Sequence, residues 1–300
     1  MSTVKSKIRN DSLNINPAVK ELTKIYGTAP SRPDHLFVSL DYETPFISEG
    51  IILRKYELTA EYGDKQCSFP FKQLTRENTP AGPIFIFLDL NDTLPSENLP
   101  CKEILDLDAT LFIICCDDVS KFSGDVRSGV GNLLSGKRRK DTSPGKLAYY
   151  AWAASRVLDF VHTLPNTINK SVCLTAHPAL SEAALLAGAL DERFFNTAAF
   201  DLNTKSYIQS PFAKFATAAV NFTRRVECLV TYFASRNLYF FRSECDITKS
   251  DCKSEIEYAE NCIDLCTHNE NDIYNKWKSL IFLINENSIF NKKAVLKPKM

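Results

Sequence analysis

Glycine is scarce in this sequence, with 10 residues among 300. Neither the G-x-G-x-x-G pattern of dinucleotide-binding folds nor the G-x-x-x-x-G-K-[ST] pattern of P-loops occurs. Both patterns need glycines where the backbone approaches a phosphate group. We therefore expect no nucleotide-binding loop and no cofactor.

An excess of either charge is also missing, because 36 lysine and arginine residues balance 36 aspartate and glutamate residues. Without a basic field, nucleic acid is not an expected partner. No apolar run approaches the roughly 18 residues that span a bilayer, and the first 19 residues, MSTVKSKIRNDSLNINPAV, lack the apolar core of a secretion signal. These absences predict a cytoplasmic protein without a membrane partner, and they leave the oligomeric state open.

Cysteine occurs at ten positions, too thinly for a disulfide scaffold. Most of the first seven lie in apolar or strand-like runs, which predicts reduced thiols packed as small hydrophobic side chains. The last four, Cys245, Cys252, Cys262 and Cys266, could suggest zinc, but only the final pair approaches the spacing of a zinc knuckle. We expect no metal and predict a cysteine-rich helical segment there.

Several stretches have the hydrophobic periodicity of strands. Residues 51–74 alternate apolar and polar side chains around a turn at 62–65, which predicts an antiparallel hairpin with one wet face. GPIFIFLDL (82–90), ATLFIICC (109–116) and SVCLTA (171–176) are continuous apolar runs, typical of strands covered on both faces. SRNLYFFRSECD (235–246) predicts a later strand.

Helical spacing of apolar residues marks three further stretches: 146–164, 180–194 and 271–287. Alternating strands and helices predict a mostly parallel sheet with helices on both faces and the antiparallel hairpin at its N-terminal side. We expect a polar lead-in at residues 1–20 and a single α/β domain at 21–300. Ligands bind such sheets at the carboxyl ends of the strands, where LTAHPALS (174–181) passes from strand to helix.

This strand-turn-helix resembles the nucleophile region of α/β-hydrolases, in which G-x-S-x-G holds a serine on a strained turn above the sheet. AHPALSEAALLAGALDERF (176–194) and GKLAYYAWAASRVLDFV (145–161) resemble the corresponding tracts of bacterial glucuronoyl-esterase-like and acetyl-xylan-esterase-like carbohydrate esterases. Segments 16–34, 83–100 and 238–246 are similar to other parts of these enzymes. The resemblance implies an α/β-hydrolase fold, shortened at 200–236 and 247–270.

The frame of these esterases places the catalytic nucleophile at Pro178, which has no hydroxyl or thiol to attack an ester. Proline fixes φ near −65° and suits the first turn of a helix, so we predict a relaxed turn with an extended residue before it. The position of the oxyanion-stabilising arginine falls on Ala179. The elbow glycines and the following lysine become Ala176, Ser181 and Glu182.

The other two triad positions lie near the C-terminus. Asp246 fits the acid position of these esterases, whereas their base position falls on Asn271, which cannot accept a proton from serine at neutral pH. The resemblance therefore implies a hydrolase scaffold without its triad. An alternative is a rearranged esterase that uses His177, Ser181 and His268 as substitute groups.

Our main interpretation is thus a non-catalytic homologue of a carbohydrate or carboxylic-ester hydrolase, acting if at all as a binding module for a small ester or carbohydrate. The second interpretation is an active esterase, of serine type or rearranged, on acetylated or glucuronoylated carbohydrate. A third is a carbohydrate-binding remnant that uses Tyr149, Tyr150 and Trp152, which core packing also explains. Strand-end carboxylates could instead suggest a glycosidase pair, although such residues commonly cap loops: Asp89, Asp92, Asp117 and Asp118.

Overall fold

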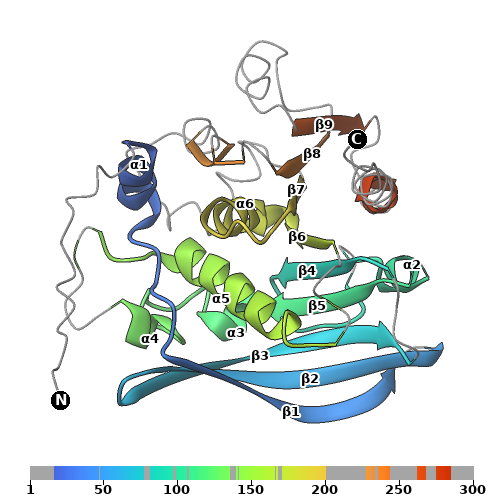
Figure 1. The fold of residues 1–300 in the computed structure, drawn as a ribbon, viewed down its shortest axis with the longest axis horizontal. Coiled ribbons are helices and arrows are strands. Elements are labelled where there is room, and N and C mark those ends of the chain that lie inside the picture. Colours follow the sequence, from blue (N-terminus) through green and yellow to red (C-terminus); the bar gives the residue numbers. More distant parts are fainter. Residues whose placement is uncertain are drawn as a thin grey trace, which may run out of the picture.

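A computed structural model gives the fold of the chain (Figure 1). It describes residues 17–46, 48–77, 82–96, 99–106, 108–135, 142–165, 171–200, 236–243, 262–267 and 275–284, together with 140, 167, 228–230, 232 and 233. Within these residues, nine strands form one sheet in the order β1-β2-β3-β5-β4-β6-β7-β8-β9. The predicted α/β-hydrolase architecture, a mostly parallel sheet with antiparallel strands at the N-terminal side, is confirmed.

The antiparallel part consists of three strands: β1 (His35–Phe46), β2 (Ser48–Tyr62) and β3 (Lys65–Arg76). The β2–β3 pair is the hairpin that the alternating pattern predicts, with Tyr62 opposite Lys65. β1 adds a third strand that the sequence analysis did not predict. β3 also pairs antiparallel with β5, which joins the ribbon to the parallel strands.

The parallel part contains six strands: β4 (Ile84–Asp89), β5 (Thr110–Cys115), β6 (Val172–Ala176), β7 (Asn196–Phe200), β8 (Asn237–Ser243) and β9 (Cys262–Thr267). The first three are buried throughout, as their continuous apolar runs predict. The expectation of a helical segment around the last cysteines was wrong, because residues 262–267 form β9 and pair with β8.

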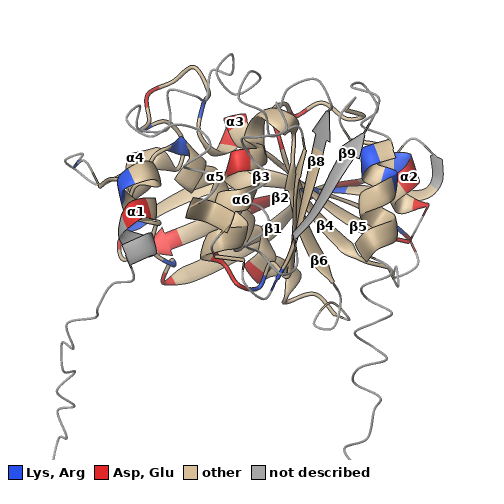
Figure 2. Cartoon of the chain, turned by 90° about the horizontal axis from the view of Figure 1, so that it is seen from above, with Lys and Arg blue, Asp and Glu red and all other residues tan. Residues whose placement is uncertain are grey.

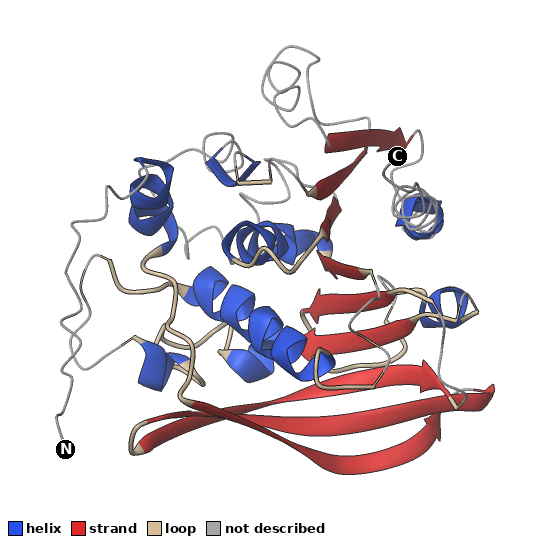
Figure 3. Ribbon diagram, viewed as in Figure 1, coloured by secondary structure: helices blue, strands red, loops and turns tan. Residues whose placement is uncertain are grey.

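Helices cover both faces of the sheet, as predicted (Figure 3). On one face lie α1 (Pro17–Tyr26), α5 (Lys146–Val161) and α6 (Ser181–Leu190). On the other lie α2 (Cys101–Leu105) and helical residues 275–284, where Trp277 packs its ring 5.3 Å from that of Phe200. Two short helices, α3 (Cys116–Val119) and α4 (Gly131–Leu134), follow β5.

Two boundaries differ from the sequence expectation. α1 begins at Pro17, so the predicted limit of the lead-in at residue 20 falls inside a helix. α6 ends at Leu190 and a turn leads into β7, whereas the helical pattern extended to residue 194. Within the part of the chain that the structure describes, none of the helices has the length and apolarity to cross a bilayer.

Candidate functional site

The turn after β6 has the relaxed geometry predicted for a helix start. His177 has φ −50° and ψ 141°, and its N–H donates to the carbonyl of Leu88 at 2.8 Å. Pro178 then begins a short 3₁₀ helix, η1 (Pro178–Leu180), which continues into α6. Among the described residues other than glycine, Asp108 alone has a positive φ. The turn after β6 is therefore an ordinary N-capped helix start without a strained backbone.

Two backbone N–H groups near the turn, in the places where α/β-hydrolases have oxyanion donors, are already hydrogen-bonded within the chain. In α/β-hydrolases, these donors are the N–H after the nucleophile and an N–H from the loop after the neighbouring strand. Here the N–H of Ala179 donates to Nδ1 of His177 at 3.1 Å. β4 lies beside β6, and in the loop after it the N–H of Leu90 donates to Oδ1 of Asp89 at 2.7 Å. Neither donor is free for a substrate oxygen.

The imidazole of His177 serves as a helix cap. Because Nδ1 accepts a hydrogen bond, the ring is neutral, with its proton on Nε2. Burial lowers the pKa of His177 to about 4. A group with this pKa is a poor general base near neutral pH, where an efficient base has a pKa close to the working pH.

Ser181 is fully buried one turn after Pro178. Its Oγ donates to the carbonyl of Phe200 at 2.8 Å and accepts from the N–H of the same residue at 3.1 Å. This reciprocal pair ties the first turn of α6 to the end of β7. The hydroxyl is thus a structural link rather than an exposed nucleophile.

Replacing Ser181 with alanine is expected to lower the free energy of unfolding by about 1–3 kcal/mol, because it leaves a buried N–H and a buried carbonyl of Phe200 without a partner. Urea denaturation followed by circular dichroism measures this change. The exposed Ser31 provides the matched control, and Ser31→Ala should stay within about 0.5 kcal/mol of the parent. Equal stabilities for both variants would contradict the assigned role.

Comparison with known proteins shows which solved structures share this fold. No protein-family model and no curated protein matches the sequence. Among solved structures, a glucuronoyl esterase from Solibacter usitatus superposes with a TM-score of 0.72 at 14% identity, covering 89% of this chain and 90% of that one. The chain has the fold of the glucuronoyl esterases. A CE15 glucuronoyl esterase from Teredinibacter turnerae T7901 has a TM-score of 0.68 at 15% identity, covering 89% of this chain and 82% of that one. The glucuronoyl esterase catalytic domain from Hypocrea jecorina has a TM-score of 0.57 at 15% identity, covering 88% of this chain and 80% of that one.

Within this glucuronoyl-esterase fold, Glu182 stands where the resemblance places a lysine. It is buried, and Oε1 accepts a 2.6 Å hydrogen bond from the hydroxyl of Tyr26 at the end of α1. The bond joins two residues that are 156 positions apart in the sequence. The first turn of α6 therefore anchors the N-terminal helix.

The strand-end carboxylates of this fold hold loops. Asp89 accepts from the N–H of Leu90, and burial raises the pKa of its carboxyl group. Oδ1 of Asp92 lies 2.6 Å from Nζ of Lys72, and Asp117 caps the N–H of Phe122 at 2.7 Å. This agrees with loop capping and gives no support to a glycosidase pair.

The aromatic residues considered for sugar stacking lie in the core, which corrects that alternative. Tyr149 and Tyr150 are fully buried, and Trp152 nearly so. The hydroxyl of Tyr150 donates to the carbonyl of Ser120 at 2.9 Å, and the ring of Trp152 packs 5.9 Å from that of Phe69. As packed here, these side chains have no surface for a carbohydrate.

The remaining predicted site residues, Asp246, His268 and Asn271, lie outside the described residues, as do Cys245 and Cys252. Their positions in the sequence still follow strand ends. β8 ends at Ser243, three residues before Asp246, and β9 ends at Thr267, directly before His268. Within the described residues, no three His, Cys, Asp or Glu side chains are grouped so that they could hold a metal.

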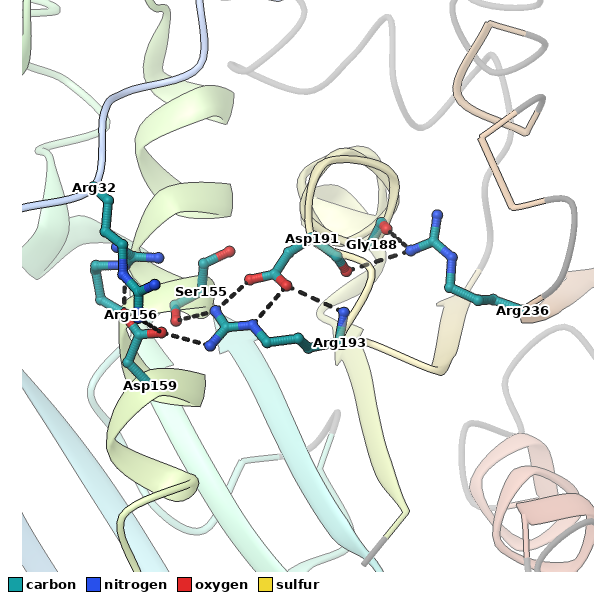
Figure 4. A network of polar contacts seen from close by, with 8 residues as sticks. All are labelled: Arg32, Ser155, Arg156, Asp159, Gly188, Asp191, Arg193 and Arg236. Atoms are coloured by element: carbon teal, nitrogen blue, oxygen red, sulfur yellow. Dashed lines mark hydrogen bonds and ion pairs between the residues drawn. The ribbon is translucent and has the colours of Figure 1, made fainter. Parts of the chain in front are cut away.

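A second polar cluster lies at the opposite edge of the sheet (Figure 4). α5 and α6 end there, before β6 and β7 begin. Oδ1 of Asp159 lies 2.6 Å from Nη1 of Arg193, whose guanidinium also binds Asp191 at 2.6 Å. Arg236 donates to the carbonyls of Gly188 and Asp191 at the end of α6. These ion pairs come from the tract with the strongest esterase resemblance, and they brace helices far from Pro178.

A cavity of about 550 Å³ lies beside Asp159 and not at the elbow. It is lined by Arg32, Pro33, Asp34, Leu36, Val38, Asp159, Phe160 and Thr163. Sequence reasoning did not find it, because its walls come from two segments more than 100 residues apart.

Proposed function

We propose that this chain is a non-catalytic homologue of a carboxylic-ester hydrolase that binds a small ester or carbohydrate without cleaving it. The observation that supports the proposal is the turn after β6: Pro178, which the resemblance assigns to the nucleophile position, begins η1, and the next N–H is bonded to His177. One residue change removes the attacking atom, and the local hydrogen bond occupies an oxyanion donor. The glucuronoyl-esterase fold supports the ligand class.

The missing serine and the occupied oxyanion donor together set how much hydrolytic rate we expect the chain to lack. Removing a single oxyanion donor typically costs a factor of about 10² to 10³ in rate, even with a nucleophile present. Without the serine, no acyl-enzyme can form at position 178. Hydrolysis by the ancestral route should therefore be undetectable.

A rearranged esterase is less well supported. Its nucleophile would be Ser181, whose hydroxyl is buried and bonded twice to Phe200. Of its two candidate bases, His268 lies outside the described residues, and the imidazole nitrogen of His177 already caps η1. Ser181 and His177 would have to leave these bonds before acting.

The proposed ligand site is the carboxyl edge of the parallel strands, where folds of this class bind ligands. We propose neither nucleic acid nor a membrane as partner, and a cytoplasmic location. Figure 2 shows acidic and basic residues on the same elements, for example Glu21 and Lys24 on α1 or Lys102 and Glu103 on α2. Such mixed charge supports a neutral small-molecule ligand better than a polyanion.

Hydrolysis of the methyl ester of glucuronic acid and of p-nitrophenyl acetate tests the proposal. The purified chain is expected to release product no faster than buffer, while an active glucuronoyl esterase assayed in parallel does so readily. Pro178→Ser should stay inactive, because the N–H of Ala179 remains bonded to His177.

Activity above buffer that disappears in Ser181→Ala and His177→Asn would overturn the proposal in favour of the rearranged esterase. Binding is measured separately, by calorimetric titration with the same glucuronate ester and with xylo-oligosaccharides. Heat with at least one of these ligands is expected at millimolar concentration, whereas none with either would contradict the binding role.

A further inference from the structure

β1 is the outermost strand of the sheet on its N-terminal side. Figures 1 and 3 show it along the margin of the molecule, with β2 as its neighbour on one side. Within the part of the chain that the structure describes, β2 is the one strand paired with β1, so this 12-residue edge offers backbone donors and acceptors to another strand. Natural proteins usually protect such an edge by charges, proline or bulges.

The second half of β1 carries these protections. Its register with β2 breaks between Leu40 and Tyr42, which leaves Asp41 in a bulge. Asp41 lies 3.6 Å from Lys55, Glu43 pairs with Arg54, and Pro45 lacks a backbone donor. These features hinder another strand from pairing beyond residue 41.

The first half carries none of them. Residues 35–40, HLFVSL, pair with β2 in unbroken register and contain no acidic residue, lysine, arginine or proline. Three large apolar side chains on this strand are also unusually exposed: Phe37 at 55%, Leu40 at 52% and Tyr42 at 43%. An uncharged, apolar and regular edge is what a partner strand would cover.

The inner face of this half is an incomplete part of the core. Leu36 and Val38 pack against the main hydrophobic cluster. Leu40 follows on the same face by the two-residue period, yet half of its surface is exposed because the sheet ends there. An added strand with an apolar residue opposite Leu40 would bury it.

We propose that the occupant is a second copy of this chain, paired antiparallel along residues 35–41 around a two-fold axis at Val38. This register sets Leu36 opposite the partner's Leu40, and His35 opposite the partner's Asp41, at both ends. Opposite side chains of an antiparallel pair share a face, so the axis must lie at a residue and not between two. An axis at Phe37 would set Leu40 against the partner's Asp34, an apolar side chain against a charge. Pairing in the chosen register also stops at the bulge.

Two general features favour self-association of this kind. The interface is isologous, so each favourable pair occurs twice. The formal net charge of the chain is zero, so two copies meet without long-range repulsion. The two sheets would join into one continuous sheet through β1.

Sedimentation velocity of the full chain between about 2 and 200 μM tests the dimer. We expect a concentration-dependent dimer, and at least a tenfold weakening in Leu40→Lys, which places a charge on the edge. Phe282→Lys is the matched control: Phe282 is 63% exposed on the helical residues 275–284, away from β1, and this variant should dimerise like the parent. A monomer at all concentrations, or a dimer unaffected by Leu40→Lys, would overturn the proposal.

Cross-linking tests the register. Directly opposite residues of an antiparallel pair have Cα atoms about 4.5–5.5 Å apart, within the range of a disulfide. Val38→Cys should therefore form a covalent dimer under mild oxidation, whereas Ser39→Cys, one residue along on the opposite face, should not. Cross-linking of Ser39→Cys in place of Val38→Cys would overturn the assigned two-fold axis, and circular dichroism confirms that both variants fold.

Discussion

Replacing Asp159 with asparagine is expected to lower the free energy of unfolding by about 3–5 kcal/mol, the typical effect of removing one partner of a buried ion pair. Asp159 is 9% exposed and lies 2.6 Å from Arg193 and 3.2 Å from Arg156. The side chain of Arg156 is 8% exposed, and among the described residues its Nη1 has no hydrogen-bond partner, while its Nε has only the ion-pair contact with Oδ2 of Asp159. The aspartate is thus the main compensation for a buried guanidinium.

Guanidinium chloride denaturation measures this effect, and Glu43→Gln is the control. Glu43 pairs with Arg54 on the solvent-exposed ribbon, where an ion pair contributes about 0.2–1 kcal/mol. Both variants neutralise one carboxylate of an ion pair, so the difference between their losses of unfolding free energy reports the effect of burial. Similar losses in both would show that the Asp159 cluster is not the brace between α5 and α6 that its geometry indicates.

Acidification is expected to destabilise the protein through His177. Its folded-state pKa, about 4, is below the ordinary value of 6.5, so the unfolded chain takes up the proton first. Stability from this residue is complete above pH 6.5 and decreases as the pH falls toward 4. The full difference corresponds to about 3 kcal/mol.

The measurement is the free energy of unfolding between pH 4 and 7 for the parent and for His177→Asn. Asparagine keeps an N-cap acceptor for Ala179 but does not titrate. Because carboxyl groups such as that of Asp89 also titrate below pH 7, the quantity of interest is the difference between the two profiles. Parallel profiles would show that His177 is not buried as a neutral cap.

The buried parallel strands could be predicted from sequence because their composition reports burial on both faces. The runs that became β4, β5 and β6 contain almost no polar residue, and no other element of that length suits them. β1 escaped prediction because most of its side chains are exposed, so the strand has little periodicity to read. β7 has five residues, NTAAF, and was not predicted because it is short and follows directly after a stretch with helical spacing.

At the candidate site, the helix start could be predicted from sequence, whereas the contacts around it could not. Pro178 indicates the helix start from the sequence alone, and the missing nucleophile stays a prediction. The bond between Ser181 and Phe200, and that between Glu182 and Tyr26, join distant segments, and no local pattern encodes them. His177 as a cap for Ala179 is a local contact that sequence reasoning could have found, since a polar residue before a proline-initiated helix commonly serves as N-cap.

Under the proposed function, the cap that His177 forms on Ala179 has an evolutionary consequence. A chain with serine at position 178 would gain no rate until the imidazole released the neighbouring N–H, and that release would weaken the start of α6. The serine alone is then expected to leave activity unchanged, and loss of the cap alone to lower stability. Under the proposal, selection acting on one of these two substitutions at a time would not favour a return to hydrolysis.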